Sequence, residues 1–161
     1  MAELSGGQGP TDMVSIQFED FDLTSEVKAL RAGDASVGAV CCFVGTVRDR
    51  NDQQSTATLE LEHYPGMTER CIGALIDDAR ERFGICAARV IHRVGELQPL
   101  DQIVLVAVTS AHRGSSFNAC EFLMDRLKTE APFWKKEHTA QGPRWVDARV
   151  SDHAAAARWR N

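Results

Sequence analysis

The feature that most constrains the fold is a stretch of helical periodicity with a glycine at each end. From Met67 to Phe83, apolar residues recur every three or four positions, which is the spacing of one face of an α-helix. Pro65-Gly66 opens this stretch and Gly84 follows it, so both ends of the helix are marked. The chain therefore contains a long helix with a single apolar face.

Segments of strand type are interleaved with the helices. The run from Val37 to Val47 is apolar and rich in β-branched residues, which predicts a strand buried on both faces. Other strands are predicted over residues 14–18, 57–64, 87–94, 102–110, 133–137 and 144–150. Two further helices are expected, capped by Thr24 or Ser25 and by Ser115 or Ser116. This mixed order predicts an α+β (mixed α/β) fold in layers.

Composition and charge exclude several classes of protein. The 161 residues suit one domain, expected over residues 14–161 behind a flexible polar tail of residues 1–13. The net charge of −5 argues against a general affinity for nucleic acid or for an anionic membrane. No apolar run approaches the roughly 20 residues that span a bilayer, and no signal peptide is evident. The expected location is the cytoplasm.

The spacing of the five cysteines does not indicate a disulfide framework. Their number is odd and no Cys-x-x-Cys pair occurs, which argues against disulfides and against a zinc site. Cys41 and Cys42 are adjacent, so in a strand they point to opposite faces. We expect the cysteines to be small buried apolar residues, and we expect neither a metal nor a cofactor.

Basic residues stand at the ends of predicted elements, where they could bind an anion. His112-Arg113 lies where a strand ends and a helix begins, and free N–H groups at a helix start attract anions. Arg48 directly follows the long apolar strand. The alternatives are a helix cap with a surface arginine and a solvated loop charge. A second pair, His92-Arg93, is expected to be structural.

Two lysines flank an apolar segment that contains Phe133. Lys128 falls in the last turn of the second long helix, one turn after Met124 on the same face. Lys135 and Glu137 share a face of the next strand. A lysine among other cations in an apolar pocket is less readily charged and can act as a nucleophile or base. The alternatives are a favourable charge at a helix C-terminus and a solvated basic strand.

Arg113 and Lys128 stand at opposite ends of one predicted helix. Fifteen positions at 1.5 Å rise per residue separate them by roughly 20 Å. A small substrate reaches both within one chain only if other elements fold back. If both ends serve one site, the simplest arrangement is a two-fold dimer in which each site borrows the His-Arg corner of its neighbour.

Six stretches together resemble the catalytic (large) subunit of molybdopterin synthase, in order and spacing, from about residue 14 to the C-terminus. They are Phe43–Arg48, Leu61–Met67, Ile91–Leu97, Thr109–Arg113, Leu127–Glu137 and Arg144–Val146. The resemblance implies an α/β hammerhead-type fold and a homodimer that binds two small ubiquitin-like subunits, a heterotetramer. Each small subunit would end in a Gly-Gly thiocarboxylate. This chain ends differently, so it would receive that tail.

The resemblance also implies the reaction and its residues. Sulfur from the thiocarboxylate would be added to cyclic pyranopterin monophosphate, forming the dithiolene of molybdopterin. By position, Lys128 and Lys135 match the family's catalytic lysines. The residues that match substrate-binding positions are Arg48, His112 and Arg113 (the last two from the neighbouring subunit), Arg149, Phe43, Met124 and Glu137.

Three alternatives stay open at this point. They are a persulfide sulfurtransferase that uses a cysteine, a non-catalytic adaptor for a ubiquitin-like carrier, and a phosphate-ligand-binding protein without chemistry. The presence of both lysines together with Arg48 and Arg113 argues against the adaptor.

Overall fold

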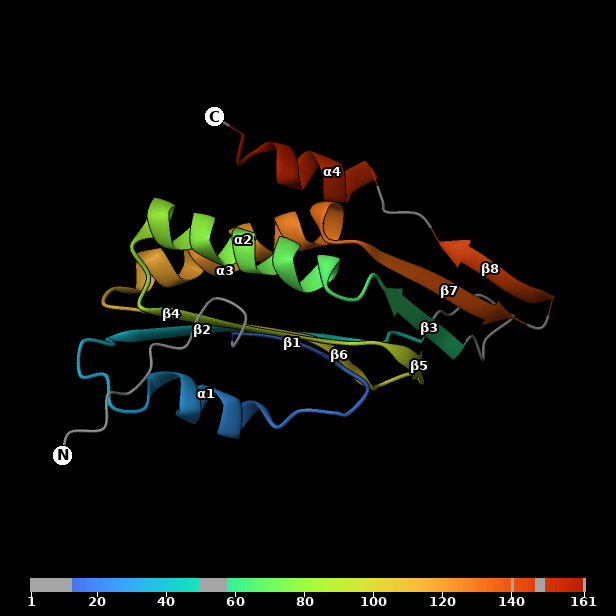
Figure 1. Cartoon of the computed structure of the whole chain (residues 1–161), viewed down its shortest axis with the longest axis horizontal. Helices are drawn as coiled ribbons and strands as arrows, with labels where there is room; N and C mark the ends of the chain where they lie inside the picture. The colour runs from blue at the N-terminus through green and yellow to red at the C-terminus, as the bar shows by residue number, and fades with distance from the viewer. Residues whose placement is uncertain (1–12, 50–57, 140, 147–149, 161) are drawn as a thin grey trace.

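The computed structural model describes residues 13–49, 58–139, 141–146 and 150–160. Within them, eight strands form two four-stranded sheets (Figure 1). The main sheet has the order β1 (Val14–Gln17), β4 (Ala87–Arg93), β6 (Gln102–Ser110), β2 (Ala39–Thr46). The second sheet has the order β5 (Gly95–Leu97), β3 (Thr58–His63), β7 (Phe133–Thr139), β8 (Gly142–Val146). Only β1 and β4 pair in parallel. The predicted α+β class is confirmed.

Helices cover both faces of the main sheet. The long helices α2 (Met67–Phe83) and α3 (Arg113–Glu130) pack on one face, and α1 (Leu23–Arg31) lies on the other (Figure 1). The last helix, α4 (Val150–Ala157), lies over α3 on the side away from the sheet (Figure 1). Within the described ranges, no helix is both long and apolar enough to cross a membrane.

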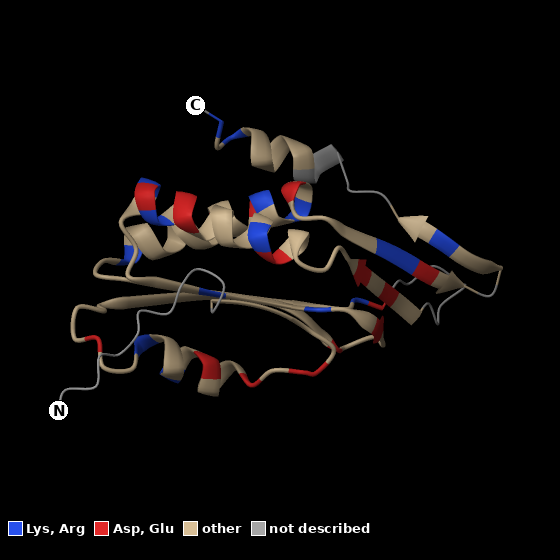
Figure 2. Cartoon of the chain, viewed as in Figure 1, with Lys and Arg blue, Asp and Glu red and all other residues tan. Residues whose placement is uncertain are grey.

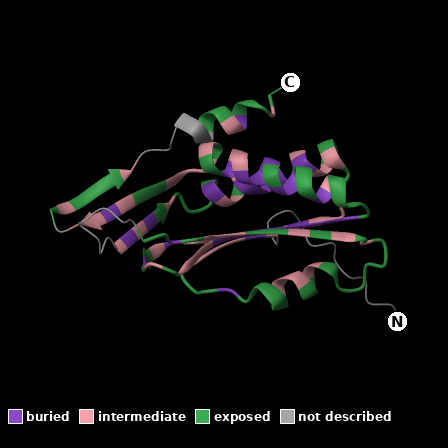
Figure 3. Ribbon diagram, turned by 180° about the vertical axis from the view of Figure 1, so that it is seen from behind, coloured by how far each residue is buried: buried purple, intermediate pink, exposed green. Residues whose placement is uncertain are grey.

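The cores follow from the alternation of side chains along β6. Val104, Val106 and Val108 point into the large core beneath α2 and α3, whereas Leu105 and Ala107 point toward α1. Buried residues concentrate in α2, α3 and the strands beneath them, and α1 is largely exposed (Figure 3). A smaller core lies where the two sheets meet. It contains Val47, Leu59, Leu61, Val94 and Leu97.

The prediction that the strand over residues 37–47 is buried on both faces is wrong. β2 lies at the edge of the main sheet, and its burial alternates. The strand covered on both faces is β6. A run of apolar residues indicates a strand but does not say which strand is central. For the same reason Cys42 is exposed and Cys41 only partly buried, whereas Cys120 is buried as expected.

Two helices begin earlier than their predicted caps. Asp22 caps α1 by accepting a hydrogen bond from the Ser25 N–H (3.0 Å). His112 is the N-cap residue of α3, whose first residue is Arg113. Ser116 cannot cap this helix because its hydroxyl is buried and bonds to the Ser110 hydroxyl.

The end of the chain differs from the predicted strand over residues 144–150. β8 ends at Val146, residues 147–149 lie outside the described part of the chain, and Val150 belongs to α4. The helix was not predicted, although its alanine-rich sequence has a high helix propensity. The short strand β5 was missed as well. Residues 1–12 of the expected tail and most of the loop after Arg48 also lie outside the described residues.

Candidate functional site

A groove of about 490 Å³ lies between β2 and α3. The Ser116 hydroxyl near the start of α3 donates to the carbonyl oxygen of Ala39, the first residue of β2 (3.4 Å). The two elements therefore begin together and run in the same direction. The α3 residues of the groove recur at helical spacing, so they form one stripe of the helix. The groove is lined by Cys41, Cys42, Phe43, Phe117, Cys120, Glu121, Met124, Asp125 and Lys128.

Three of the predicted site residues meet in this groove: Phe43, Met124 and Lys128. The Phe43 ring is 41% exposed on the edge strand. Its position depends on Gly45, because a Cβ there would lie 2.8 Å from Val104 Cγ1 and 3.3 Å from Phe43 Cε1. Glycine thus lets the ring lie back against its own strand and leaves the groove open.

The second predicted lysine lies at the junction of the two sheets. Phe133, at the start of β7, pairs with His63 on β3 and stacks on His92 of β4, with ring centroids 3.8 Å apart. Lys135 follows two residues later on the same face as Phe133. We call Lys128, Lys135, His63, His92 and Phe133 the junction site.

Both lysines affect the pKa of His92. Burial of its ring, together with the positive charges of Lys135, His63 and Lys128, lowers the His92 pKa to about 4. Its Nδ1 faces the Arg93 carbonyl oxygen at 2.8 Å, a bond that opposes the shift. The imidazole is therefore neutral near pH 7. The positive charges of Lys128 on α3 and Lys135 on β7 both disfavour the protonation of this ring.

Glu137 shares a face with Lys135, as predicted, and its carboxylate is already paired with an arginine. The Glu137 side chain is 5% exposed and accepts a hydrogen bond from Arg144 Nη2 on β8 (3.2 Å). Removing Arg144 would leave this buried carboxylate without its arginine partner, which is costly for a buried charge.

The neighbouring Lys136 points the other way. Its ammonium lies 5.3 Å from the centre of the Trp145 ring on the outer face of the second sheet. β7, which carries a basic segment, lies between the acidic strand β3 and β8 on this sheet (Figure 2). There His138 contacts Glu60 (2.7 Å). The half-buried Lys136 therefore lies on the face opposite to Lys135, which is exposed and shares its face with Phe133 and Glu137.

The predicted anion-binding residues are separated by the length of the main sheet. Gly45 and His92 both lie opposite Val104, so Arg48, just past the end of β2, lies at the same end of the sheet as the junction site. His112 and Arg113 lie at the other end, beside Ser110 and Ala39. Arg48, His112 and Arg113 are exposed. Arg149 lies outside the described residues.

The structure adds two histidines that the sequence did not place in the site. His92 has the structural role expected of it, since its ring stacks on Phe133, and the charges of both lysines lower its pKa. His63 is held by Glu69, with Nε2 3.4 Å from Oε1. No local signal marks either histidine, because the contacts come from different sheets. Cationic groups beside apolar walls suit a negatively charged ligand with an apolar part.

Comparison with known proteins gives the family. The family model described as MoaE protein matches residues 16–130. The chain is 61% identical over 146 residues to the molybdopterin synthase catalytic subunit of Ralstonia nicotianae, covering 91% of this chain and 83% of that protein. A solved structure of the molybdopterin biosynthesis MoaE protein from Burkholderia ambifaria matches with a TM-score of 0.79 and 56% identity, covering 91% and 97% of the two chains. A complex of subunits 1 and 2 of molybdopterin-converting factor from Helicobacter pylori shares the fold, with a TM-score of 0.71, 21% identity and coverage of 85% and 92%. The chain belongs to the MoaE family of molybdopterin synthase catalytic subunits.

Proposed function

We propose that this chain transfers sulfur from the C-terminal thiocarboxylate of a small ubiquitin-like subunit to cyclic pyranopterin monophosphate, forming the dithiolene of molybdopterin. The observation that carries the proposal is that Phe43, Met124 and Lys128, which match the family's site positions, line one largely apolar groove. The family of the chain makes this the reaction to test first.

The proposed roles follow from the charges. The thiocarboxylate brings sulfur in an activated form, so the catalytic chain needs no thiol or metal of its own. Lys128 and Lys135 stabilise negative charge and move protons while sulfur adds to carbon. Arg48, at the same end of the sheet, holds phosphate. The neutral His92 positions Phe133 and does not compete with the lysines for a proton near pH 7.

The assembly is proposed on the geometry of α3. His112 and Arg113 lie roughly 20 Å from Lys128 along this helix. A two-fold homodimer in which each site takes these two residues from its neighbour would complete the anion-binding set. Relatives are named catalytic subunits, which implies a further subunit, and the Helicobacter pylori structure is described as a complex of two subunits. We therefore propose a heterotetramer with two small subunits.

Two further expectations remain part of the proposal. Residues 14–161 form one domain, and the protein works in the cytoplasm. Arg149, Phe43, Met124 and Glu137 complete the substrate pocket, with Glu137 acting through its contact with Arg144.

The test is a sulfur-transfer assay. The purified full chain is mixed with the cyclic pterin and a thiocarboxylated Gly-Gly carrier, and molybdopterin is detected by fluorescence after oxidation. Lys128→Ala and Lys135→Ala should each lose most of the activity while the protein stays folded. Lys136→Ala is the matched control, because Lys136 lies on the opposite face of the same strand.

The outcomes separate the alternatives. No product from the unaltered chain, with the carrier still bound, would favour the adaptor. Activity lost on replacing all five cysteines would favour a persulfide mechanism. Near-normal turnover in either lysine variant would contradict the proposed roles.

A further inference from the structure

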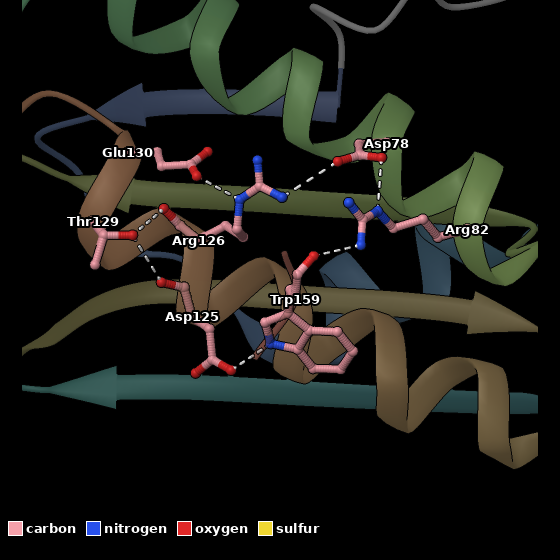
Figure 4. Close-up of polar contacts among 7 residues, drawn as sticks. All are labelled: Asp78, Arg82, Asp125, Arg126, Thr129, Glu130 and Trp159. Atoms are coloured by element: carbon pink, nitrogen blue, oxygen red, sulfur yellow. Dashed lines mark hydrogen bonds and ion pairs between the residues drawn. The ribbon is translucent and has the colours of Figure 1, made fainter. Parts of the chain in front are cut away.

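A carboxylate in the wall of the groove is held by the C-terminal end of the chain. Asp125 Oδ2 accepts hydrogen bonds from Arg158 Nη2 (2.7 Å) and from Trp159 Nε1 (2.7 Å), and its side chain is only 17% exposed (Figure 4 shows the Trp159 bond). Arg158 Nη2 also donates to Glu121 Oε1 (2.8 Å). Glu121 and Asp125 are both groove residues. One guanidinium therefore occupies two carboxylates of the groove wall.

This contact removes the Asp125 carboxylate as an ion-pair partner for Lys128. Asp125 and Lys128 are three positions apart on α3, and oppositely charged residues at this spacing normally attract each other on a helix surface. Among the residues that the structure describes, the Lys128 ammonium has no ion pair and no hydrogen bond, and Asp125 is turned to the C-terminal residues. The acid nearest to Lys128 along the groove stripe is thus already satisfied.

Trp159 is fixed from several sides. Its ring packs edge-on against Phe83 and Phe122, with centroids 5.7 and 5.6 Å away. Its carbonyl oxygen accepts a hydrogen bond from Arg82 Nη1 (2.8 Å), and Arg82 is paired with Asp78 of α2 (Figure 4). These contacts anchor Arg158 and Trp159 to α2 and α3.

We infer that Arg158 and Trp159 are positioning residues, which hold the Asp125 carboxylate away from Lys128 and so keep this ammonium unpaired for an anionic ligand in the groove. Without them, Asp125 would be free to turn to Lys128. A carboxylate at Lys128 would repel an anionic ligand and stabilise the ammonium over the reactive free amine. The meaning of this for catalysis rests on the proposed function. The contact itself can be tested without it.

The test is the reactivity of Lys128 in the full chain. An N-hydroxysuccinimide ester acylates free amines, and mass spectrometry of peptides gives a rate for each lysine at pH 8. Arg158→Gln should slow the acylation of Lys128 about twofold to fivefold, the range for exposed ion pairs. Trp159→Phe, which keeps a ring and removes only the N–H donor, should slow it less. Lys136 is the internal control.

Reversal at a second site gives the decisive comparison. Asp125→Asn alone should leave the rate of Lys128 unchanged, and Arg158→Gln with Asp125→Asn should restore it. Arg158→Lys should restore part of it. An unchanged or faster Lys128 in both Arg158→Gln and Trp159→Phe would overturn the inference.

The sulfur-transfer assay separates the two proposals. If the unaltered chain is active, Arg158→Gln should raise KM for the pterin more than it lowers kcat, and Asp125→Asn should reverse this change. An inactive unaltered chain with the expected acylation rates would refute the proposed function and leave the inference standing. An active chain in which the acylation rate of Lys128 does not fall in the Arg158 and Trp159 variants would refute only the inference.

Discussion

The ring of His92 stacks on the ring of Phe133, with centroids 3.8 Å apart and an angle of 20° between the planes. This contact joins β4 of the main sheet to β7 of the second sheet, and the charges of Lys128 and Lys135 both act on the His92 ring. The stability of the junction site should therefore depend on the protonation of one histidine.

The free energy of unfolding should fall in mild acid because of His92. The His92 pKa is about 4 in the folded chain and 6.5 in the unfolded chain. Between pH 4 and pH 6.5 the unfolded chain therefore binds more protons than the folded chain. Stability from this group is complete above pH 6.5 and is lost as the pH falls toward 4, by about 3 kcal/mol. Urea unfolding at pH 7, 5.5 and 4 measures it.

The control for this prediction is His92→Phe, which keeps a stacked ring that cannot titrate. Its loss of stability between pH 7 and pH 4 should be smaller than that of the unaltered chain by about the same 3 kcal/mol. Equal slopes for the two proteins would show that His92 titrates normally.

Gly45→Ala should close part of the groove. The added Cβ meets Val104 Cγ1 at 2.8 Å and the Phe43 ring at 3.3 Å, so the Phe43 ring must move. We expect a loss of about 1–3 kcal/mol of stability from overpacking. We also expect a larger rise in KM than fall in kcat. The variant Gly45→Ala with Phe43→Leu should regain part of the affinity, and a double variant as weak as Gly45→Ala would argue against this cause.

Cys42 should be the cysteine that a bulky thiol reagent labels first, on the face of β2 that is turned toward α1. It is exposed, whereas Cys120 is buried and its pKa is raised above the ordinary value by burial and by Cys41. Burial also raises the Cys42 pKa, so the reaction should speed up markedly above pH 8. Mass spectrometry should find label on Cys42 first and on Cys120 last.

The effect of labelling on sulfur transfer depends on where the Cys42 side chain points, because the thiol has no chemical role in the proposed reaction. Because Cys42 pairs with Ala107 and points away from α3, labelling should leave most of the sulfur transfer intact, and Cys42→Ser should be fully active. An inactive Cys42→Ser would instead point to a chemical role for the thiol.

The proposed dimer predicts complementation between inactive variants. Lys128→Ala and Arg113→Ala disable a site from different chains if each site takes Arg113 from its neighbour. Mixed after subunit exchange in equal amounts, they should recover about a quarter of the normal activity, since half the dimers are mixed and each has one intact site. A mixture of Lys128→Ala with Lys135→Ala, both within one chain, is the control that should recover none. No recovery in the first mixture would place Arg113 outside the neighbour's site.

The sequence predicted the fold class and most elements because periodicity is a local property. The long helices, β4 and β6 agree closely with their predicted ranges. The burial of β2 was wrong, since an apolar run carries no information on whether a further strand covers its edge. The start of α3 was wrong because Ser116 is used in the core, which depends on Ser110 and Ala39.

The candidate site was predictable in part. Phe43, Met124 and Lys128 meet in one groove, and the family resemblance, which the comparisons confirm, had named all three. Their roles stay predictions. The stacking of His92 on Phe133 and the hydrogen bond from Arg158 to Asp125 are contacts between distant segments, which no spacing in the sequence reveals.

The continuous course of α3 along β2 has a consequence for changes in chain length. One residue inserted between Arg113 and Lys128 would turn the two ends of the helix by about 100° relative to each other and lengthen it by about 1.5 Å. Lys128 would then leave the groove, or the His112 corner would rotate away from the position that a second chain has to meet. A change that a surface loop absorbs easily would thus put the two halves of the proposed site out of phase. Insertions and deletions among relatives should accordingly fall in the turns and at the ends of the chain, and α3 should keep its residue count.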